Sequence, residues 1–235
     1  MKTTAVFFYM TFVFSICISS AQGQIPILES EAILDKLRLN KGINGVETLQ
    51  YSNLTGDPYL FKDFKKGKLV VLSGAKFDVT IRYDIYANEM HLQNKGEIFA
   101  IIHPEKVNRI ETDSLTFIYS KLIKSQGEET TKDGSYFILQ ADGKCKLLIK
   151  KNMRIQDPEP PKLYQDAKPP KFVNTSDTYY LKLKDASAVR IKNEKDLFAV
   201  LGDEEKALSQ FIHSNRLKIK NLEDLVKIVT YYNGL

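Results

Sequence analysis

Short runs of alternating apolar and polar residues follow one another closely through the first half of the chain, with turn-forming residues between them. Such alternation is typical of half-buried β-strands. The candidate strands span residues 46–51, 68–72, 79–86, 89–93, 98–102, 107–112 and 115–119. Helical crossovers between parallel strands have no room in these short intervals, so we expect neighbouring strands to be antiparallel. The pattern predicts an antiparallel β-meander over residues 23–156, either as a sheet or as a partly open barrel.

The most regular run lies at 79–93 and is broken once, at Ala87 and Asn88. It predicts two strands joined by a tight bend. Asp84 and Glu89 would face each other across this bend as a carboxylate pair for acid–base catalysis. The interpretation we favour is that they pair with Arg82 or solvate an exposed sheet face. The candidate binding surface on this stretch consists of Arg82, Asp84, Glu89 and His91.

An Asp142-Gly143 pair marks a second predicted hairpin. A two-residue Asp-Gly turn pairs Ala141 with Lys144, and the register follows by counting outward. In this register Cys145 shares a face with apolar residues, so we expect a buried and unreactive thiol. Only this cysteine remains if residues 1–22 are removed as a signal peptide, so no intramolecular disulfide is expected.

Residues 157–172 contain five of the eight prolines in the chain. Proline has no amide hydrogen and cannot join a central strand, so the segment should be extended. We interpret it as a proline-rich strap or linker that marks a domain boundary and packs on its own protein. Docking of the segment into the aromatic groove of a partner is the alternative.

The C-terminal part, 173–235, combines a predicted β-hairpin with three predicted helices at 194–201, 203–214 and 222–232. Asn193 and Asn221 stand where a side chain caps the first and third helices. Segments 190–201 and 218–229 share an Ile-Lys-Asn entry followed by an Asp-Leu pair, so we expect the same local structure at both helix starts. Together with the meander, this region predicts an α+β protein.

Residues 1–22 have the composition of a secretory signal peptide, with Lys2, a short apolar run at 6–18 and small residues at the end. The apolar run is too short to span a bilayer comfortably, and no second long apolar run follows it. We therefore expect an exported protein, periplasmic or extracellular, with no transmembrane segment in the mature chain.

The formal net charge of +5 is modest, and both signs are scattered along the chain. Nucleic-acid-binding proteins concentrate basic residues on one face, so no nucleic acid partner is expected. One local concentration comprises Lys144, Lys146, Lys150 and Lys151. These lysines are candidates for contact with an anionic glycan or a lipid headgroup, although charged edge strands also protect against aggregation.

Motifs for catalysis and for metal or cofactor binding are missing from the sequence. The three histidines lie far from one another, without HExxH or CxxC spacing. There is no G-x-S-x-G nucleophile elbow and no phosphate-binding glycine-rich loop. We therefore assign no catalytic residue, no metal and no cofactor.

The GDPYL stretch at 56–60, the Lys66-Gly67 turn, RYDIYANEM at 82–90 and the closing helices together resemble an uncharacterised family of exported, signal-peptide-bearing Bacteroidota proteins. The resemblance covers most of the mature chain and implies a bacterial periplasmic or secreted location, without an activity. We expect a non-enzymatic envelope or secreted protein, a binding or assembly module whose partner is another envelope protein or an anionic glycan or lipid headgroup. The alternative is a hydrolase or transferase whose site assembles from distant residues such as Asp84, Glu89 and His91.

Overall fold

The computed structural model describes residues 38–39, 51, 54–123, 134–161 and 163–235. These residues form mostly β-strands, with three α-helices near the C-terminus, so the fold belongs to the α+β class as predicted. The predicted signal peptide, and the predicted strand at 46–51 except Tyr51, lie outside the described residues. Within the described ranges, no helix has the length and apolar character needed to cross a membrane.

Twelve strands form one sheet in the part of the chain that the structure describes. The sheet has the order β1-β5-β4-β3-β2-β6-β7-β9-β10-β11-β12-β8. The strands are β1 (Arg38–Leu39), β2 (Lys65–Val71), β3 (Lys76–Asp84), β4 (Glu89–Asn94), β5 (Glu97–Ile101), β6 (Val107–Thr112), β7 (Thr116–Ser120), β8 (Leu122–Ile123), β9 (Ser135–Ala141), β10 (Cys145–Gln156), β11 (Lys171–Leu183) and β12 (Ala188–Ile191). Two short 3-10 helices, η1 (Pro104–Lys106) and η2 (Gly202–Glu204), lie in connections.

The strands β2 to β5 follow one another as antiparallel neighbours, and β3 and β4 are the two halves of the run at 79–93. The order departs from a simple meander after β5, because β6 pairs with β2 and not with β5. The outer edge of β5 is occupied by β1. Leu69 and Val71 of β2 share one core with Val107 and Ile110 of β6. Burying these apolar faces together favours the placement of β6 beside β2.

The sheet curls back on itself where β7 becomes β8. β7 pairs with β9, and after the single residue Lys121 the chain continues as β8, which pairs in parallel with β12. Six strands therefore surround a small core, and each contributes one buried side chain to it. These side chains are Ile118, Leu122, Phe137, Leu148, Tyr180 and Ala188.

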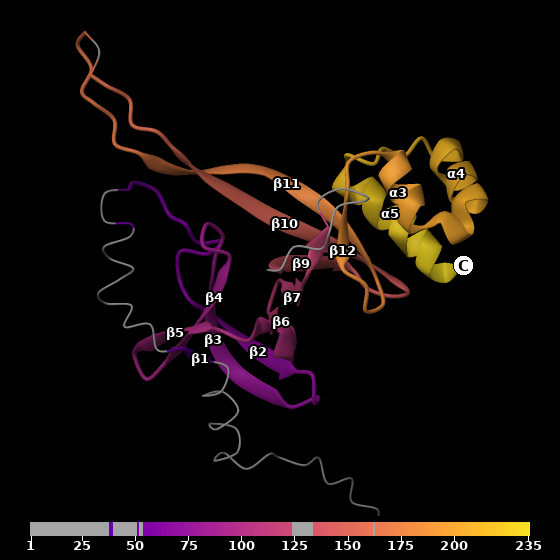
Figure 1. The fold of residues 1–235 in the computed structure, drawn as a ribbon, viewed down its shortest axis with the longest axis horizontal. Coiled ribbons are helices and arrows are strands. Elements are labelled where there is room, and N and C mark those ends of the chain that lie inside the picture. Colours follow the sequence, from indigo (N-terminus) through magenta and orange to yellow (C-terminus); the bar gives the residue numbers. More distant parts are fainter. Residues whose placement is uncertain (1–37, 40–50, 52–53, 124–133, 162) are drawn as a thin grey trace, which may run out of the picture.

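Three helices, α3 (Glu194–Val200), α4 (Glu205–Ser214) and α5 (Leu222–Gly234), gather at one end of the molecule (Figure 1). The predicted caps are confirmed, because Asn193 and Asn221 accept hydrogen bonds from Asp196 N and Asp224 N at 3.0 Å. The apolar faces of the helices pack against one face of β10 and β11. This second core includes Cys145, Leu147, Leu181, Leu197, Leu208, Leu225 and Ile228.

The predicted register of the β9–β10 hairpin is wrong. Ala141 pairs with Leu147, not with Lys144. The physical reason lies in α5, where the Asn233 side chain accepts a hydrogen bond from Cys145 N at 2.7 Å and donates one to Cys145 O at 2.9 Å. Backbone groups that would have extended the ladder with β9 are satisfied by this side chain, so the connection is wider than a two-residue turn.

Cys145 is fully buried, as predicted, and burial raises the pKa of its thiol to about 12. Because the thiolate is the reactive form, we expect native protein to react with a thiol reagent at least about a hundredfold more slowly than unfolded protein. Release of nitrothiobenzoate with and without denaturant measures this ratio, and equal rates would contradict it.

The unfolded thiol has an ordinary pKa near 9 and loses its proton first. The contribution of the Cys145 thiol therefore lowers the free energy of unfolding as the pH rises from about 9 toward 12.

The strands β10 and β11 form a long hairpin whose far end projects from the rest of the fold (Figure 1). Their pairing extends to Gln156 and Lys171, and residues 157–170 close the hairpin. We call residues 157–170, together with the adjoining ends of β10 and β11, the arm. The predicted strap packs on its own protein only at its end, where Phe172 is buried, whereas residues 163–169 are all exposed. The strands that flank the predicted domain boundary are direct neighbours in one sheet, and the division into domains stays a prediction.

Candidate functional site

The β3–β4 hairpin brings together the four polar residues predicted around the bend. Asp84 lies opposite Glu89, and Arg82 lies opposite His91, in the antiparallel register. The predicted facing of the two carboxylate residues across the bend is therefore confirmed. We call these four residues the β3–β4 polar cluster.

Two members of this cluster are buried. Asp84 and His91 are each 1% exposed, so neither lies on an exposed sheet face. The Asp84 carboxylate accepts hydrogen bonds from Tyr51 Oη at 3.0 Å and from Ala87 N at 2.8 Å. A buried carboxylate needs such donors to offset the cost of leaving water. Asp84 therefore stabilises the bend between β3 and β4.

Aromatic residues from the segment before β2 cover the cluster. The Arg82 guanidinium carbon lies 3.5 Å from the centroid of the Tyr59 ring and 4.4 Å from that of Phe64. Tyr59 also packs edge-to-face against the His91 ring, with centroids 5.9 Å apart. Such cation–π and aromatic contacts hold the covering segment against the strands. The half-buried guanidinium of Arg82 is thus enclosed by rings.

The side chains of this cluster contact one another and the rings that cover them. Glu89 Oε2 lies 3.4 Å from His91 Nε2, within reach of a hydrogen bond. An acid–base site needs such groups to meet a substrate, whereas Asp84 and His91 are covered by the protein itself. Across the ranges that the structure describes, no group of three or more His, Cys, Asp or Glu residues is arranged to hold a metal ion.

The four predicted lysines lie on β10 and in the turn before it, and each has a polar neighbour. The partners of Lys144, Lys146, Lys150 and Lys151 are, in that order, Asp203 at 3.3 Å, Asp142, Asn152 at 3.3 Å and Asp177 at 2.7 Å. Three of the four charges are therefore balanced by carboxylates. Whether the four lysines bind an anion stays a prediction.

Comparison of the chain with models of protein families, with functionally described proteins and with solved structures finds no match. Function is therefore inferred from what this chain buries and what it exposes. The polar residues singled out from the sequence are mostly buried or paired. The most exposed large apolar side chains in the described residues belong to the arm.

The tip of the arm presents two large side chains to solvent. Leu163 is 84% exposed and Tyr164 is 96% exposed, and Tyr164 adopts a left-handed conformation with φ of +63°. Beneath them, Glu159 and Lys168 exchange two backbone hydrogen bonds of 3.0 Å and form an ion pair of 3.0 Å. Leu163 and Tyr164 therefore lie beyond a pair of hydrogen bonds that closes the turn. Sequence reasoning missed this pair, and the flanking prolines are the signal that marks it.

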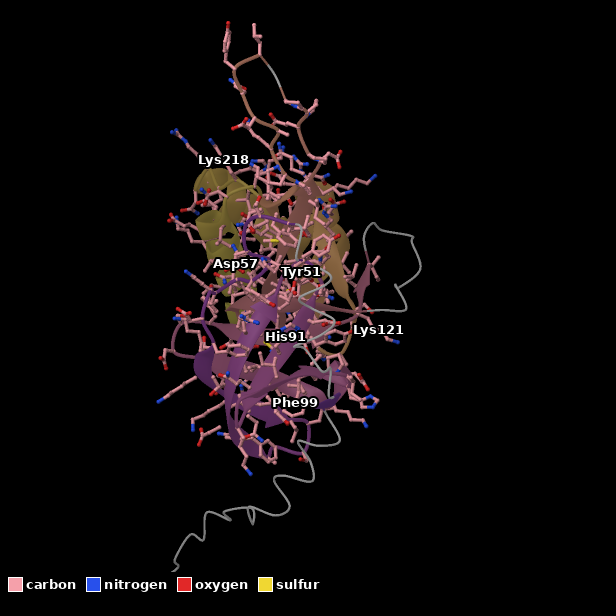
Figure 2. All side chains as sticks on the ribbon, turned by 90° about the vertical axis from the view of Figure 1, so that its left-hand side faces the viewer. Tyr51, Asp57, His91, Phe99, Lys121 and Lys218 are labelled. Carbon is pink, nitrogen blue, oxygen red and sulfur yellow. The ribbon has the colours of Figure 1, made fainter. Side chains whose placement is uncertain are left out.

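The base of the arm is tied to the segment before β2 and to the turn between β3 and β4. Thr55 N donates to Pro170 O at 3.0 Å, and Phe172 N donates to Thr55 O at 2.9 Å. The Phe172 ring contacts Tyr51 and Tyr86 edge-to-face, with centroids 5.1 and 5.3 Å away. Figure 2 shows Tyr51, Asp57 and His91 in the body of the molecule, below the projecting arm. The arm is thus anchored at its base and extends beyond the body at its tip.

Proposed function

We propose that this protein is an exported, non-enzymatic binding or assembly module of the bacterial envelope or its surroundings, and that the arm tip engages a partner protein. The observation that carries this proposal is the exposure of Leu163 and Tyr164 at the end of an anchored hairpin. At 84% and 96% exposure, these side chains contribute little to the stability of this fold. Their burial in a partner would contribute about 1.5–3 kcal/mol for each side chain.

The construction of the arm supports a binding role. Prolines restrict the backbone on both sides of the tip, and the Glu159–Lys168 ladder closes the turn. A segment already ordered in its bound shape loses less conformational entropy on association. Tyrosine is also enriched where interfaces are most tightly packed, since its ring is large and its hydroxyl group tolerates water.

The charges beside the tip favour a protein over an anionic surface. Glu159, Asp166 and Lys168 bring both signs close to Leu163 and Tyr164. An anionic glycan or lipid headgroup would require a net positive surface. We therefore propose another envelope protein with an apolar pocket and a polar rim as the partner of the arm.

The sequence supports the exported location in this proposal. Residues 1–22 have the order of a signal peptide, and RYDIYANEM belongs to the resemblance to exported Bacteroidota proteins. In the same proposal, the antiparallel β-meander with its β3–β4 polar cluster serves as the rigid base that holds the arm.

Site-specific photocrosslinking in the producing cells tests the role of the arm. A photoreactive phenylalanine analogue at position 164 is expected to crosslink one defined protein, whereas the same analogue at Leu72, which is 67% exposed, is not. The double variant Leu163→Ser/Tyr164→Ser should reduce recovery of that protein by at least about tenfold, because both apolar contacts are lost. Its thermal unfolding should match that of the parent protein.

The matched control is Leu72→Ser, which removes one exposed leucine outside the arm. It should retain full recovery of the partner. The proposal fails if position 164 crosslinks no more than position 72, or if the double variant recovers the partner as well as the parent protein does.

A further inference from the structure

A hollow of about 490 Å³ lies over the neighbouring strands β2, β3 and β4, beside the β3–β4 polar cluster. Its volume lies in the range of small-ligand sites. We call this feature the β2–β4 hollow. Its polar lining consists of Lys66, Asp78, Thr80, Gln93, Asn94 and Lys95.

Arg82 lies next to this hollow on the same face of the sheet. Thr80, which lines the hollow, precedes Arg82 by two residues on β3, so the two side chains point to the same face about 7 Å apart. Lys66 and Gln93 lie opposite Thr80 on the two neighbouring strands. An arginine side chain spans the distance between these rows, so the half-buried guanidinium of Arg82 can reach a ligand in the hollow.

The guanidinium of Arg82 has no hydrogen-bond acceptor within the described part of the chain. Its Nε atom is buried without a partner, and no ion pair to the group is present among the described residues. The rings of Tyr59 and Phe64 hold the group in place, with centroids 3.5 and 4.4 Å from the guanidinium carbon. Buried donors are almost always paired in folded proteins. A fixed guanidinium with unused donors therefore indicates an acceptor from outside the chain.

The carboxylates on this face of β3 and β4 do not serve Arg82, because each bonds to other groups. These carboxylates belong to Asp78, Asp84 and Glu89. Their partners are, in that order, Lys68 at 3.1 Å, Tyr51 and Ala87 at 3.0 and 2.8 Å, and His91 at 3.4 Å.

We infer that the β2–β4 hollow binds a saccharide that carries a carboxylate group, with Arg82 as the partner of that carboxylate. The planar guanidinium matches a carboxylate through two parallel hydrogen bonds. The hydroxyl group of Thr80 and the amides of Gln93 and Asn94 both donate and accept hydrogen bonds, as sugar hydroxyl groups do. This site is separate from the arm, so its failure would leave the proposed role of the arm unchanged.

The surroundings of the hollow favour a sugar over an acidic peptide. A peptide is held chiefly by buried apolar anchors, but Leu92, an apolar residue in the lining, is itself 3% exposed and offers little surface. The recess continues across β2 as a second hollow of about 330 Å³, where Glu111 and Asp113 join the lining. These acidic residues repel a second anionic group and accept hydrogen bonds from uncharged hydroxyl groups. The expected ligand thus has its acid group at the Arg82 end.

Calorimetry with three probes tests this inference. An aldobiouronic acid, a disaccharide of one uronic acid and one neutral sugar, should bind. Its methyl ester has the same hydroxyl groups without the charge and should bind at least about tenfold more weakly. The dipeptide Gly-Glu carries carboxylates without sugar hydroxyl groups and should not bind detectably. Higher ionic strength should weaken binding of the acid but not of the ester.

Two variants separate the contacts to the acid from the contacts to the hydroxyl groups. Arg82→Lys keeps the charge but loses the planar fork, so it should weaken binding of the acid about tenfold and leave the ester unchanged. Thr80→Val removes one hydroxyl group and suits a strand, so it should weaken binding of acid and ester alike. Thr80→Val also provides a test that does not depend on the packing of Arg82 against its rings.

The matched control is Lys76→Gln, which removes a charge from an exposed side chain of β3 outside the hollow. It should bind the acid as the parent protein does. The inference is overturned if the acid does not bind, if the ester or Gly-Glu binds as tightly, or if either hollow variant binds normally. An equal loss of affinity in Lys76→Gln would also overturn it, because general charge would then explain the binding.

Discussion

Replacing Asn88 with Ala is expected to lower the free energy of unfolding by about 3–5 kcal/mol, because one side chain joins two distant strands by four hydrogen bonds. Asn88 Oδ1 accepts bonds from Tyr83 Oη at 3.1 Å, Ser135 Oγ at 2.9 Å and Tyr136 N at 3.1 Å. Its Nδ2 donates to Gly134 O at 3.2 Å. The β3–β4 bend is thereby fastened to the start of β9.

The expected cost is large because the partners of Asn88 are enclosed. Tyr83, Ser135 and Tyr136 are 2%, 1% and 3% exposed, so water cannot readily replace the lost acceptor. Burial raises the pKa of the Tyr83 hydroxyl well above its ordinary value. A donor left unsatisfied in such surroundings costs about 1–3 kcal/mol. Asn88 also has φ of +56°, a conformation that alanine adopts poorly.

Chemical denaturation followed by circular dichroism measures this effect, and two further variants separate its causes. Asn88→Gly removes the hydrogen bonds but tolerates the positive φ, so it should still lose most of the stability. The control Lys95→Ala changes a residue of φ +49° in the neighbouring β4–β5 turn and should cost less than about 1 kcal/mol, because lysine and alanine both carry a Cβ atom at this φ. If Asn88→Gly were as stable as the parent protein, the hydrogen bonds would not carry the effect.

Replacing Asn233 with Ala is expected to lower the free energy of unfolding by about 2–4 kcal/mol, because both backbone groups of a buried residue lose their partner. Asn233 bonds Cys145 N at 2.7 Å and Cys145 O at 2.9 Å, and its Nδ2 also lies 3.4 Å from Asp142 O. Cys145 is 0% exposed. The end of α5 therefore holds the start of β10 in the observed register.

A double-mutant cycle with Gly143 tests the same contact from the other side. A Cβ atom on Gly143 would lie 2.6 Å from Asn233 Nδ2, so Gly143→Ala alone should be destabilising. In the Asn233→Ala background the clashing amide is absent, and Gly143→Ala should cost at least about 0.5 kcal/mol less than it does alone. Strictly additive effects would show that the two residues do not interact.

Asn215→Ala provides the control for Asn233. Its amide also lies near the end of a helix and donates to Phe211 O at 2.9 Å, but it is exposed. Water can replace this bond, so the expected loss is below about 1 kcal/mol. Equal costs at the two positions would mean that burial of the backbone partner is not the cause.

Local patterns predicted much of the secondary structure. The alternation at 79–93 predicts β3, β4 and the facing of Asp84 and Glu89, because the two-residue period and a short bend act within one hairpin. Asn193 and Asn221 predict the starts of α3 and α5 for the same reason, since a cap bonds a backbone group three residues away. These features depend on near neighbours alone.

The candidate sites were predicted less completely. Alternation places Arg82 and His91 on a polar face, but their cover comes from Tyr59, which lies outside this hairpin in the segment before β2. The polar residues of the β2–β4 hollow are scattered in the sequence, and only the pairing of three strands sets Lys66 and Gln93 beside Thr80. The prolines of the arm indicate an extended segment without indicating which side chains it exposes.

By itself, the sequence of this protein determined most of the strands, the helix caps and the α+β class, because these depend on the backbone and on residues a few positions apart. The tertiary structure decided that β6 lies beside β2, that Asn233 sets the register at Cys145, and that Leu163 and Tyr164 stand at an exposed tip. These outcomes depend on apolar surfaces and hydrogen-bonding groups that are distant in the chain and meet only when the whole sheet has formed.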